Sequence, residues 1–219
     1  MSNLHNIYPK VAIVADQMTA FGGADREMIS MLKVFPKADI FTVLFYKEKY
    51  PMIKNKVYTS FVQKLTKIFG KNFSRHLKVL NPFAYENFSF DEYDLVISIS
   101  AGPSKSVITG IDQPHLAMVM TPPRSLWDNE LNVRGSKLKW LYKPLSHILN
   151  TYLRVWDISI AKRVDYWSAN SKFVARKIKK TYGVDAKVLY PGVEEKYFKQ
   201  VKESKEGKKI LASLKDKYD

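Results

Sequence analysis

Short apolar runs alternate with longer amphipathic stretches along the chain. The runs are rich in Val, Ile and aromatic residues, which favour strands, and they lie at 11–15, 38–45, 93–100, 114–120, 165–169 and 186–190. Between them, 24–35 and 171–183 have apolar residues at helical spacing, with Pro36 ending the first and Ser171 and Gly183 as expected caps of the second. The pattern predicts an α/β fold: a single Rossmann-like, doubly wound, mostly parallel sheet with helices on both faces.

The apolar runs do not alternate with polar residues, as expected of parallel strands buried on both faces. In such sheets ligands bind at the carboxyl ends of the strands. Three loops therefore form the candidate site: "DQMTAFGGAD" (16–25), "SAGPSKS" (100–106) and "TPPRSLWDN" (121–129). The first has two adjacent glycines before a predicted helix, where backbone N–H groups and the helix dipole favour an anion. A tight turn from strand to helix explains the same glycines without a ligand.

Two basic stretches stand apart from this pattern. Residues 54–80 hold seven basic side chains and no acidic one, with an apolar helical stripe at Val62, Leu65, Phe69, Phe73 and Leu80. The stretch fits a helix at an anionic membrane surface, or an ordinary helix that packs its stripe on the sheet, and Gly70 is expected to divide it. The second stretch, 134–163, is helical in pattern, and Pro144 predicts a kink or break within it.

The composition bounds the class of protein. With 219 residues, 46% hydrophobic and 13% aromatic, the chain suits one large or two small globular domains. Its net charge of +15 favours anionic partners, or serves only to keep the surface soluble. No motif of specific nucleic-acid binding occurs. The sequence has no cysteine, no metal-like His spacing, no signal peptide and no apolar run of about 18–20 residues, so we expect a cytoplasmic protein without a bound metal.

Four segments occur in a fixed order: "VAIVADQMTAFGGADREMISMLKVFPKADIFTVLF", "YDLVISISAGPSKSV", "TPPRSLWD", and a closing segment that runs from "RVWDISIAKRVDYWSANS" to "YPGVE". Together they cover about residues 9–195 and resemble the retaining glycosyltransferases of family 4. Within that family they are most similar to the mannosyltransferase-like subgroup that makes bacterial surface polysaccharides and glycolipids. A lone Gly-Gly is common in proteins, whereas four ordered motifs are specific.

The resemblance implies a GT-B architecture, in which a cleft separates two Rossmann-like domains. Residues 1–195 correspond to the acceptor-side domain, and the Lys-rich residues 196–219 to a linker toward a donor domain that this sequence lacks. The complete enzyme uses a GDP- or UDP-linked nucleotide-sugar as cosubstrate, a lipid-linked or cell-surface glycan as acceptor, and no other cofactor. Expected partners are a separate donor-domain chain and the inner face of an anionic membrane, and the chain alone is expected to be inactive.

The resemblance assigns the glycines of the first loop to substrate binding and assigns no catalytic residue. Gly22 and Gly23 correspond to the loop that approaches the donor phosphate or the transferred sugar across the cleft. The loop does not spell the Gly-x-Gly-x-x-Gly fingerprint, which disfavours a dinucleotide such as NAD.

Further substrate-binding positions follow the later strands. Met120, Thr121 and Arg124 correspond to residues that line the same cleft. Arg124 pairs with a phosphate or an anionic group of the acceptor, or forms a salt bridge with Asp128 one turn later. Asn170 opens the last predicted helix and either caps it or contacts the ligand.

Three positions depart from the family pattern, because Ala15, Met120 and Tyr166 stand where histidine is usual. Met120 can neither donate a hydrogen bond nor carry a charge at the transferred sugar. These departures favour a competing hypothesis, a non-catalytic or degenerate binding module for anionic membrane or phosphate ligands. The sequence leaves open whether the chain is a fragment, a relic or a subunit of a split enzyme.

Overall fold

The computed structural model describes residues 7–70, 80–128, 139–192 and 204–210, and only the backbone at 139–146. The chain divides into two compact units, Met1–Leu189 and Tyr190–Asp219. In the second unit a short helix spans 205–210, and the Ser204 hydroxyl accepts a hydrogen bond from the Gly207 N–H at 2.9 Å. The domain boundary predicted at 195 falls within 193–203, outside the described residues.

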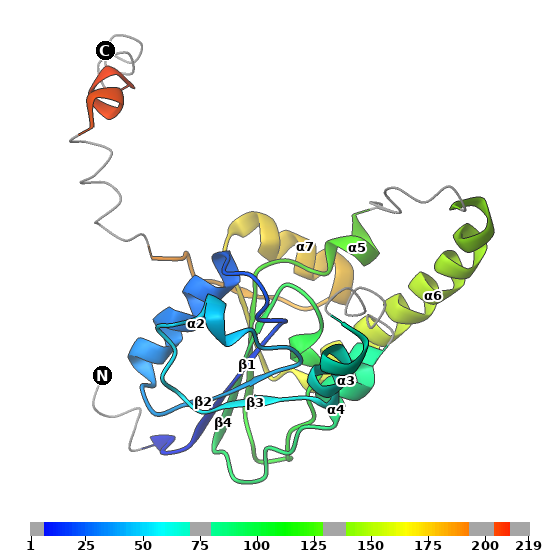
Figure 1. Cartoon of the computed structure of the whole chain (residues 1–219), viewed down its shortest axis with the longest axis horizontal. Coiled ribbons are helices and arrows are strands. Elements are labelled where there is room, and N and C mark those ends of the chain that lie inside the picture. Colours follow the sequence, from blue (N-terminus) through cyan, green and yellow to red (C-terminus); the bar gives the residue numbers. More distant parts are fainter. Residues whose placement is uncertain (1–6, 71–79, 129–138, 193–203, 211–219) are drawn as a thin grey trace. The chain divides into compact units, whose positions relative to one another are not determined.

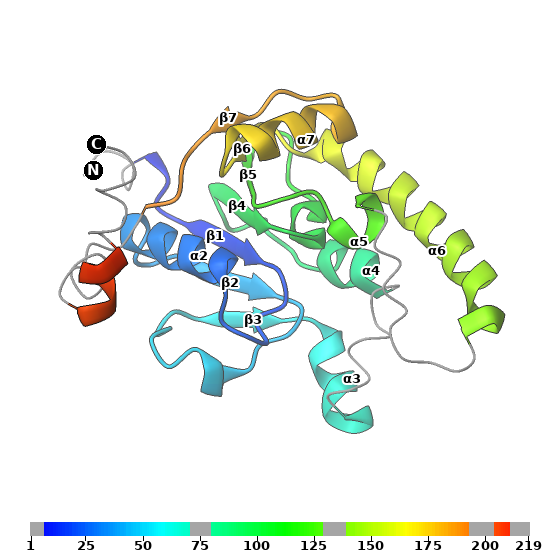
Figure 2. The same ribbon diagram turned by 90° about the horizontal axis from the view of Figure 1, so that it is seen from above.

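The first unit (Figure 1) is built on a seven-stranded sheet in the order β3-β2-β1-β4-β5-β6-β7, and Figure 2 labels all of its strands. Every strand pair is parallel. The strands are β1 (Val11–Ala15), β2 (Asp39–Thr42), β3 (Val57–Thr59), β4 (Leu95–Ser100), β5 (His115–Val119), β6 (Tyr166–Ala169) and β7 (Lys187–Val188). The chain winds outward in both directions from β1 and β4, which confirms the predicted doubly wound sheet.

Each predicted strand run contains a strand, and β1 and β4 are buried along their whole length, as their continuous apolar sequence indicated. The run at 38–45 is longer than its strand, because after Thr42 the backbone turns to meet the β1 loop. There the Met18 N–H donates to the Leu44 carbonyl at 2.8 Å. The short edge strand β3, which pairs Val57 with Ile40, was not predicted.

Helices cover both faces of the sheet (Figure 2). They are α2 (Gly23–Val34), α3 (Phe61–Phe69), α4 (Asn81–Glu86), α5 (Arg124–Trp127), α6 (Lys139–Ile160) and α7 (Lys172–Tyr182), with short 3-10 helices η1 (Lys47–Lys49), η3 (Pro103–Ser106) and η4 (Ala161–Arg163). Met28 of α2 packs with the odd-numbered side chains of β1. Tyr85 of α4 packs with the even-numbered ones, and Val174 of α7 lies on β5 and β6. The prediction of helices on both faces is therefore confirmed.

The predicted helix ends are confirmed in α7. The Ser171 hydroxyl accepts a hydrogen bond from the Val174 N–H at 3.2 Å, and Gly183 adopts the left-handed conformation with φ of 74°. Helix α3 ends at Gly70, with φ of 85°, and the remainder of the basic stretch, 71–79, lies outside the described residues. Helix α6 runs through Pro144 without interruption, so the chain does not break there, and a kink at Pro144 stays a prediction.

Candidate functional site

A cavity of about 400 Å³ lies at the carboxyl ends of β1 and β4, where the sheet changes winding direction. The loops after both strands line it, together with the first residue of α4, the helix α5 and one side of α6. Ligands of open α/β sheets bind at this position, and ligand pockets commonly have this volume. Five segments of the sequence therefore meet at one candidate site.

Asp16 joins the two central loops at the floor of this cavity. It follows β1 directly, and its carboxylate accepts hydrogen bonds from the Ala101 N–H at 2.7 Å and from the Ser104 N–H at 3.0 Å. Gly102 leaves room for this contact, since a Cβ there would lie 3.3 Å from the carboxylate. Burial raises the pKa of Asp16 above its ordinary 3.8, and the hydrogen bonds from Ser104 and Ala101 oppose that effect.

A buried ion pair lies at the cavity, and one of its members, Asp157, lines it. The ammonium of Lys105 lies 2.6 Å from the carboxylate of Asp157, and both side chains are 1% exposed. The second carboxylate oxygen accepts hydrogen bonds from the Trp127 indole N–H and the Tyr182 hydroxyl, each at 2.8 Å. Lys105 also donates to the Gly102 carbonyl at 3.2 Å. The pair therefore ties the β4 loop, α5, α6 and α7 together around the cavity. Burial, and then the negative charge of Asp157, raises the pKa of Tyr182, so this hydroxyl stays protonated.

Arg124 is the predicted site residue that lines the cavity, at the start of α5. Its side chain is exposed and makes no ion pair or side-chain hydrogen bond with any residue that the structure describes. The alternative salt bridge with Asp128 is absent from the described residues, because Asp128 instead accepts two hydrogen bonds from Lys177, at 2.6 and 2.7 Å. Among the described residues none neutralises the Arg124 guanidinium, so within that part of the chain its charge is available to an anion.

The other positions predicted after β5 and β6 lie beside each other. The Asn170 amide donates to the Met120 sulfur at 3.9 Å, and the Thr121 hydroxyl donates to the Pro122 carbonyl at 3.1 Å. The cap of α7 is Ser171 rather than Asn170. Met120, Thr121 and Asn170 thus form a partly buried edge of the sheet that does not line the cavity described above.

Gly22 and Gly23 are exposed at the start of α2 and do not line the cavity either. The Gly22 N–H donates to the carboxylate of Asp25 at 2.7 Å, which closes the first turn of the helix. Gly22 has φ of −146°, an ordinary extended value, and a Cβ at Gly23 would meet no atom within 4 Å. The turn itself therefore does not require glycine at either position.

Sequence reasoning missed three residues of this site, Asp16, Lys105 and Asp157. A signal existed for Asp16, because it is the acidic residue immediately after a buried strand and opens a candidate loop. Lys105 also lies in a candidate loop, but its partner is 52 residues away in a long amphipathic helix. No local pattern joins those two.

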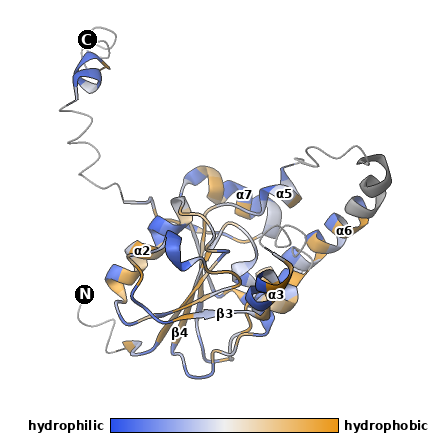
Figure 3. Ribbon diagram, viewed as in Figure 1, coloured by the Kyte–Doolittle hydropathy of each residue, from blue (hydrophilic) through white to orange (hydrophobic). Residues whose placement is uncertain are grey.

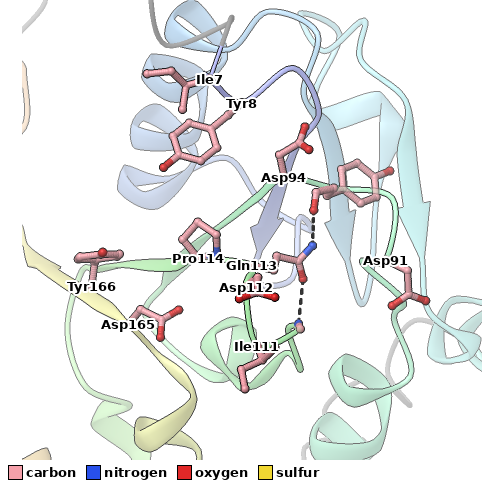
Figure 4. A pocket seen from close by; sticks show the side chains of 12 residues that line it. Ile7, Tyr8, Asp91, Asp94, Ile111, Asp112, Gln113, Pro114, Asp165 and Tyr166 are labelled. Atoms are coloured by element: carbon pink, nitrogen blue, oxygen red, sulfur yellow. Dashed lines mark hydrogen bonds between the residues drawn. The ribbon is translucent and has the colours of Figure 1, made fainter.

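A larger cavity, of about 850 Å³, lies at the opposite, amino edge of the sheet (Figure 4). Its polar groups hold the ends of the strands. The carboxylate of Asp94 accepts from the Lys10 N–H at 2.7 Å, and that of Asp165 accepts from the His115 N–H at 2.8 Å. Gln113 hydrogen-bonds to the backbone of Tyr93 and Gly110. These side chains have structural partners, so we assign the candidate site to the smaller cavity at the carboxyl edge.

Within the described ranges, no group of three or more His, Asp or Glu side chains is arranged to hold a metal ion. None of the helices in the described ranges combines the length and the apolar character that crossing a bilayer requires.

No family model and no curated protein matches the sequence. Among solved structures, the chain is similar to Anabaena Alr3699/HepE in three complexes. The complex with UDP and glucose has a TM-score of 0.47, with 16% identity over 84% of this chain and 45% of that chain. For the complex with UDP the TM-score is 0.49, with 16% identity over 93% and 49%. For the UDP-glucose complex it is 0.48, with 16% identity over 88% and 48%. The chain thus spans about half the length of these structures.

Proposed function

We propose that residues 1–195 form the acceptor-side domain of a retaining, nucleotide-sugar-dependent glycosyltransferase of family 4, within a GT-B architecture. The observation that carries the proposal is the meeting of three of the family-like segments around one cavity. "DQMTAFGGAD" contributes Asp16, "SAGPSKS" contributes Gly102, and "TPPRSLWD" contributes Arg124. Segments of a shared binding site are expected to converge in this way at the carboxyl edge of the sheet.

In this proposal each predicted position has a defined task. Arg124 binds an anionic group through its guanidinium. Thr121, Met120 and Asn170 face the transferred sugar, and Gly22 and Gly23 present the start of α2 to the donor phosphate. Because Met120 cannot donate a hydrogen bond and its sulfur is only a weak acceptor, the sugar is held mainly by its neighbours.

The chain supplies one side of the reaction. The donor, a GDP- or UDP-linked sugar, is held by a donor domain elsewhere in the protein or on a separate chain, and 196–219 is the linker toward it. The acceptor is a lipid-linked or cell-surface glycan at the inner face of the membrane. The isolated chain then binds nucleotide-sugars weakly, with a Kd above about 1 mM, since most donor contacts lie in the other domain.

The proposal is tested by analysing the glycans of cells that naturally make this protein. Deleting the gene that encodes the chain is expected to shorten a lipid-linked or surface glycan by one sugar, as measured by mass spectrometry. The native chain is expected to restore the glycan, and Arg124→Gln to restore less than a tenth of it. Arg176→Gln, an exposed arginine on α7, is the charge-matched control and is expected to restore it fully. An unchanged glycan profile after deletion would contradict the proposal, and so would micromolar nucleotide-sugar affinity of the isolated chain in calorimetry.

The surface of α3 supports a second proposed activity, peripheral binding to an anionic membrane. Phe61, Ile68 and Phe69 are 37%, 73% and 62% exposed, and Lys64 and Lys67 are also exposed. The α3 ribbon carries both hydrophobic and hydrophilic residues (Figure 3). No acidic residue occurs in Phe61–Phe69. Aromatic and aliphatic side chains enter the interface, while each lysine near anionic lipid adds about 1 kcal/mol.

Vesicle sedimentation tests this activity. The chain is expected to sediment with phosphatidylglycerol-containing vesicles and not with pure phosphatidylcholine. Lys64→Glu with Lys67→Glu is expected to reduce the bound fraction at least tenfold, because it reverses two charges at the interface. The control Lys179→Glu with Lys180→Glu makes the same charge change on α7, where both lysines are exposed. Equal loss in both variants would indicate a response to net charge alone and would count against a docking role for α3.

A further inference from the structure

Helix α6 is apolar on two opposite faces. On its inner face Leu153 and Ile160 are buried against the rest of the first unit. Its outer face presents four apolar side chains that are 69%, 53%, 64% and 44% exposed, namely Ile148, Tyr152, Val155 and Ile158. Their spacing of three and four residues places them along one side of the helix. A helix that is apolar all round is normally covered all round, so the outer face is expected to have a partner.

The position of α6 leaves this outer face accessible. Both ribbon views show α6 at the boundary of the first unit, with no described element beyond it (Figures 1 and 2). Three residues of the same helix line the candidate cavity from the other side, Asn150, Leu153 and Trp156. One helix therefore carries a wall of the candidate site and, on its back, an uncovered apolar surface.

The outer face also carries no charge. Arg154 and Asp157 are the charged residues of 147–159, and both are engaged on the inner side. The Arg154 Nε–H donates to the Leu126 carbonyl at 2.7 Å, and Asp157 is buried in its ion pair. The other exposed side chains of this stretch are polar and have no formal charge at pH 7, namely His147, Thr151 and Ser159.

This neutrality distinguishes between occupants of the face. A helix at an anionic membrane has Lys or Arg beside its apolar residues, as α3 has, and an acidic protein partner also needs cations to attract it. The outer face of α6 offers neither. Two copies of this chain repel each other through a net charge of +15 each, so they meet most readily at a surface without charge. A second copy is therefore the occupant that the charge pattern favours.

The outer face is complementary to itself in one arrangement. If two α6 helices pack antiparallel about a two-fold axis, Tyr152 of each copy lies against Val155 of the other, and Ile148 lies against Ile158. A large ring then meets a small side chain, and each contact occurs twice in a closed dimer. A parallel pair would instead set ring against ring and Val against Val, which packs less evenly. The antiparallel pair also places the two helix dipoles in opposite directions.

We propose that the outer face of α6 is a dimer interface, through which two copies of this chain pair antiparallel. The inference goes beyond the proposed function and does not rest on it. The contact runs over about three helical turns, roughly 15 Å, which is at the low end of specific interfaces. We therefore expect a reversible dimer with a Kd of about 10–100 μM.

Analytical ultracentrifugation of the chain without lipid tests the proposal, from about 1 to 300 μM. A monomer–dimer equilibrium is expected, and it should not weaken when the salt is raised from about 0.15 to 0.5 M, because salt screens the repulsion between copies. Val155→Lys is expected to raise the Kd at least tenfold, since it places a charge in an apolar contact. Ile111→Lys makes a similar change at an exposed isoleucine of the amino edge and should leave the Kd unchanged.

Two variants test the antiparallel arrangement. Tyr152→Lys and Val155→Glu are each expected to weaken self-association at least tenfold. Their equimolar mixture should associate at least fivefold more tightly than either variant alone, because antiparallel packing brings the two opposite charges together across the axis. Both positions are exposed, and thermal unfolding verifies that the variants are folded. A mixture no tighter than its components would overturn the antiparallel pairing.

Other outcomes would overturn the proposal as a whole. It fails if the chain is monomeric at every concentration, or if Ile111→Lys weakens the dimer as much as Val155→Lys. If the chain is monomeric and Val155→Lys instead reduces its sedimentation with vesicles, the outer face contacts lipid and not a second copy. None of these results bears on the glycan analysis that tests the proposed function.

Discussion

Replacing Lys105 with methionine is expected to lower the free energy of unfolding by about 3–5 kcal/mol. The variant leaves the carboxylate of Asp157 buried without its cation, in a site where both side chains are 1% exposed. Removing one partner of a buried pair leaves the other charge without water or a counter-ion, which costs more than the pair itself contributes. Since single domains are stable by about 5–15 kcal/mol, urea unfolding should show a large shift of the midpoint.

Two further variants separate the charge effect from the loss of side-chain packing. Lys105→Met combined with Asp157→Asn removes both charges while an amide oxygen remains to accept from Trp127 or Tyr182. We expect the double variant to lose less than half as much stability as Lys105→Met alone. If the double variant is as unstable as the single one, packing rather than charge accounts for the loss.

An exposed pair of the same length provides the matched control. Lys179 and Asp185 also lie 2.6 Å apart, but their side chains are 55% and 87% exposed. Lys179→Met is expected to change the free energy of unfolding by less than about 0.5 kcal/mol, because solvent screens such pairs. A similar loss in both lysine variants would contradict the importance of burial.

The fold could be predicted from the sequence because the central strands of the sheet are buried on both faces. A continuous apolar run such as "VAIVA" or "LVISIS", when it alternates with amphipathic helices along the chain, favours a buried strand of a parallel sheet. Strand ends were less predictable, since Val43 and Leu44 are buried by a loop contact and not by the strand ladder. An apolar sequence predicts which residues are buried, but buried residues such as Val43 and Leu44 continue past the last hydrogen-bonded residue of the strand. The edge strand β3 was missed because only Val57 in it is aliphatic and it pairs on one side alone.

The candidate site could be predicted only in part from the sequence. Parallel topology predicted that the carboxyl-end loops lie together, and the family resemblance singled out Arg124 in one of them; Arg124 lines the cavity, whereas the other predicted site residues do not. The Lys105–Asp157 pair depends on how α6 lies against the β4 loop, and no local spacing records that packing.

The second large effect concerns His115, which is fully buried at the start of β5. Its Nδ1 lies 3.2 Å from the Arg163 carbonyl, which can only accept, so Nδ1 carries the proton. Its Nε2 then accepts from the Ser98 hydroxyl at 2.9 Å, and the ring is neutral. Burial is the main cause that lowers the pKa of His115 from 6.5 to about 4, with Lys105 adding to it, while the Arg163 carbonyl and Asp165 oppose the change.

The sign of the pH effect follows from these values. Below pH 6.5 the histidine binds a proton in the unfolded chain but stays neutral in the folded one until about pH 4. The unfolded state therefore binds more protons in this range, and stability falls as the pH is lowered. At about 1.4 kcal/mol for each pKa unit, His115 removes about 2–3 kcal/mol of stability between pH 7 and pH 4.5.

Urea unfolding at several pH values isolates this contribution when His115→Gln is compared with the native chain. Glutamine keeps a donor and an acceptor for the Arg163 carbonyl and Ser98, and it does not titrate. It can be less stable at pH 7, but its stability should decrease by about 2–3 kcal/mol less than that of the native chain on acidification to pH 4.5. The acidic residues titrate in both proteins and cancel in the difference. His147→Gln makes the same substitution at an exposed position and is the control for the change of residue type. If stability falls equally with pH in His115→Gln and in the native chain, folding does not lower the pKa of His115. That result would contradict the prediction.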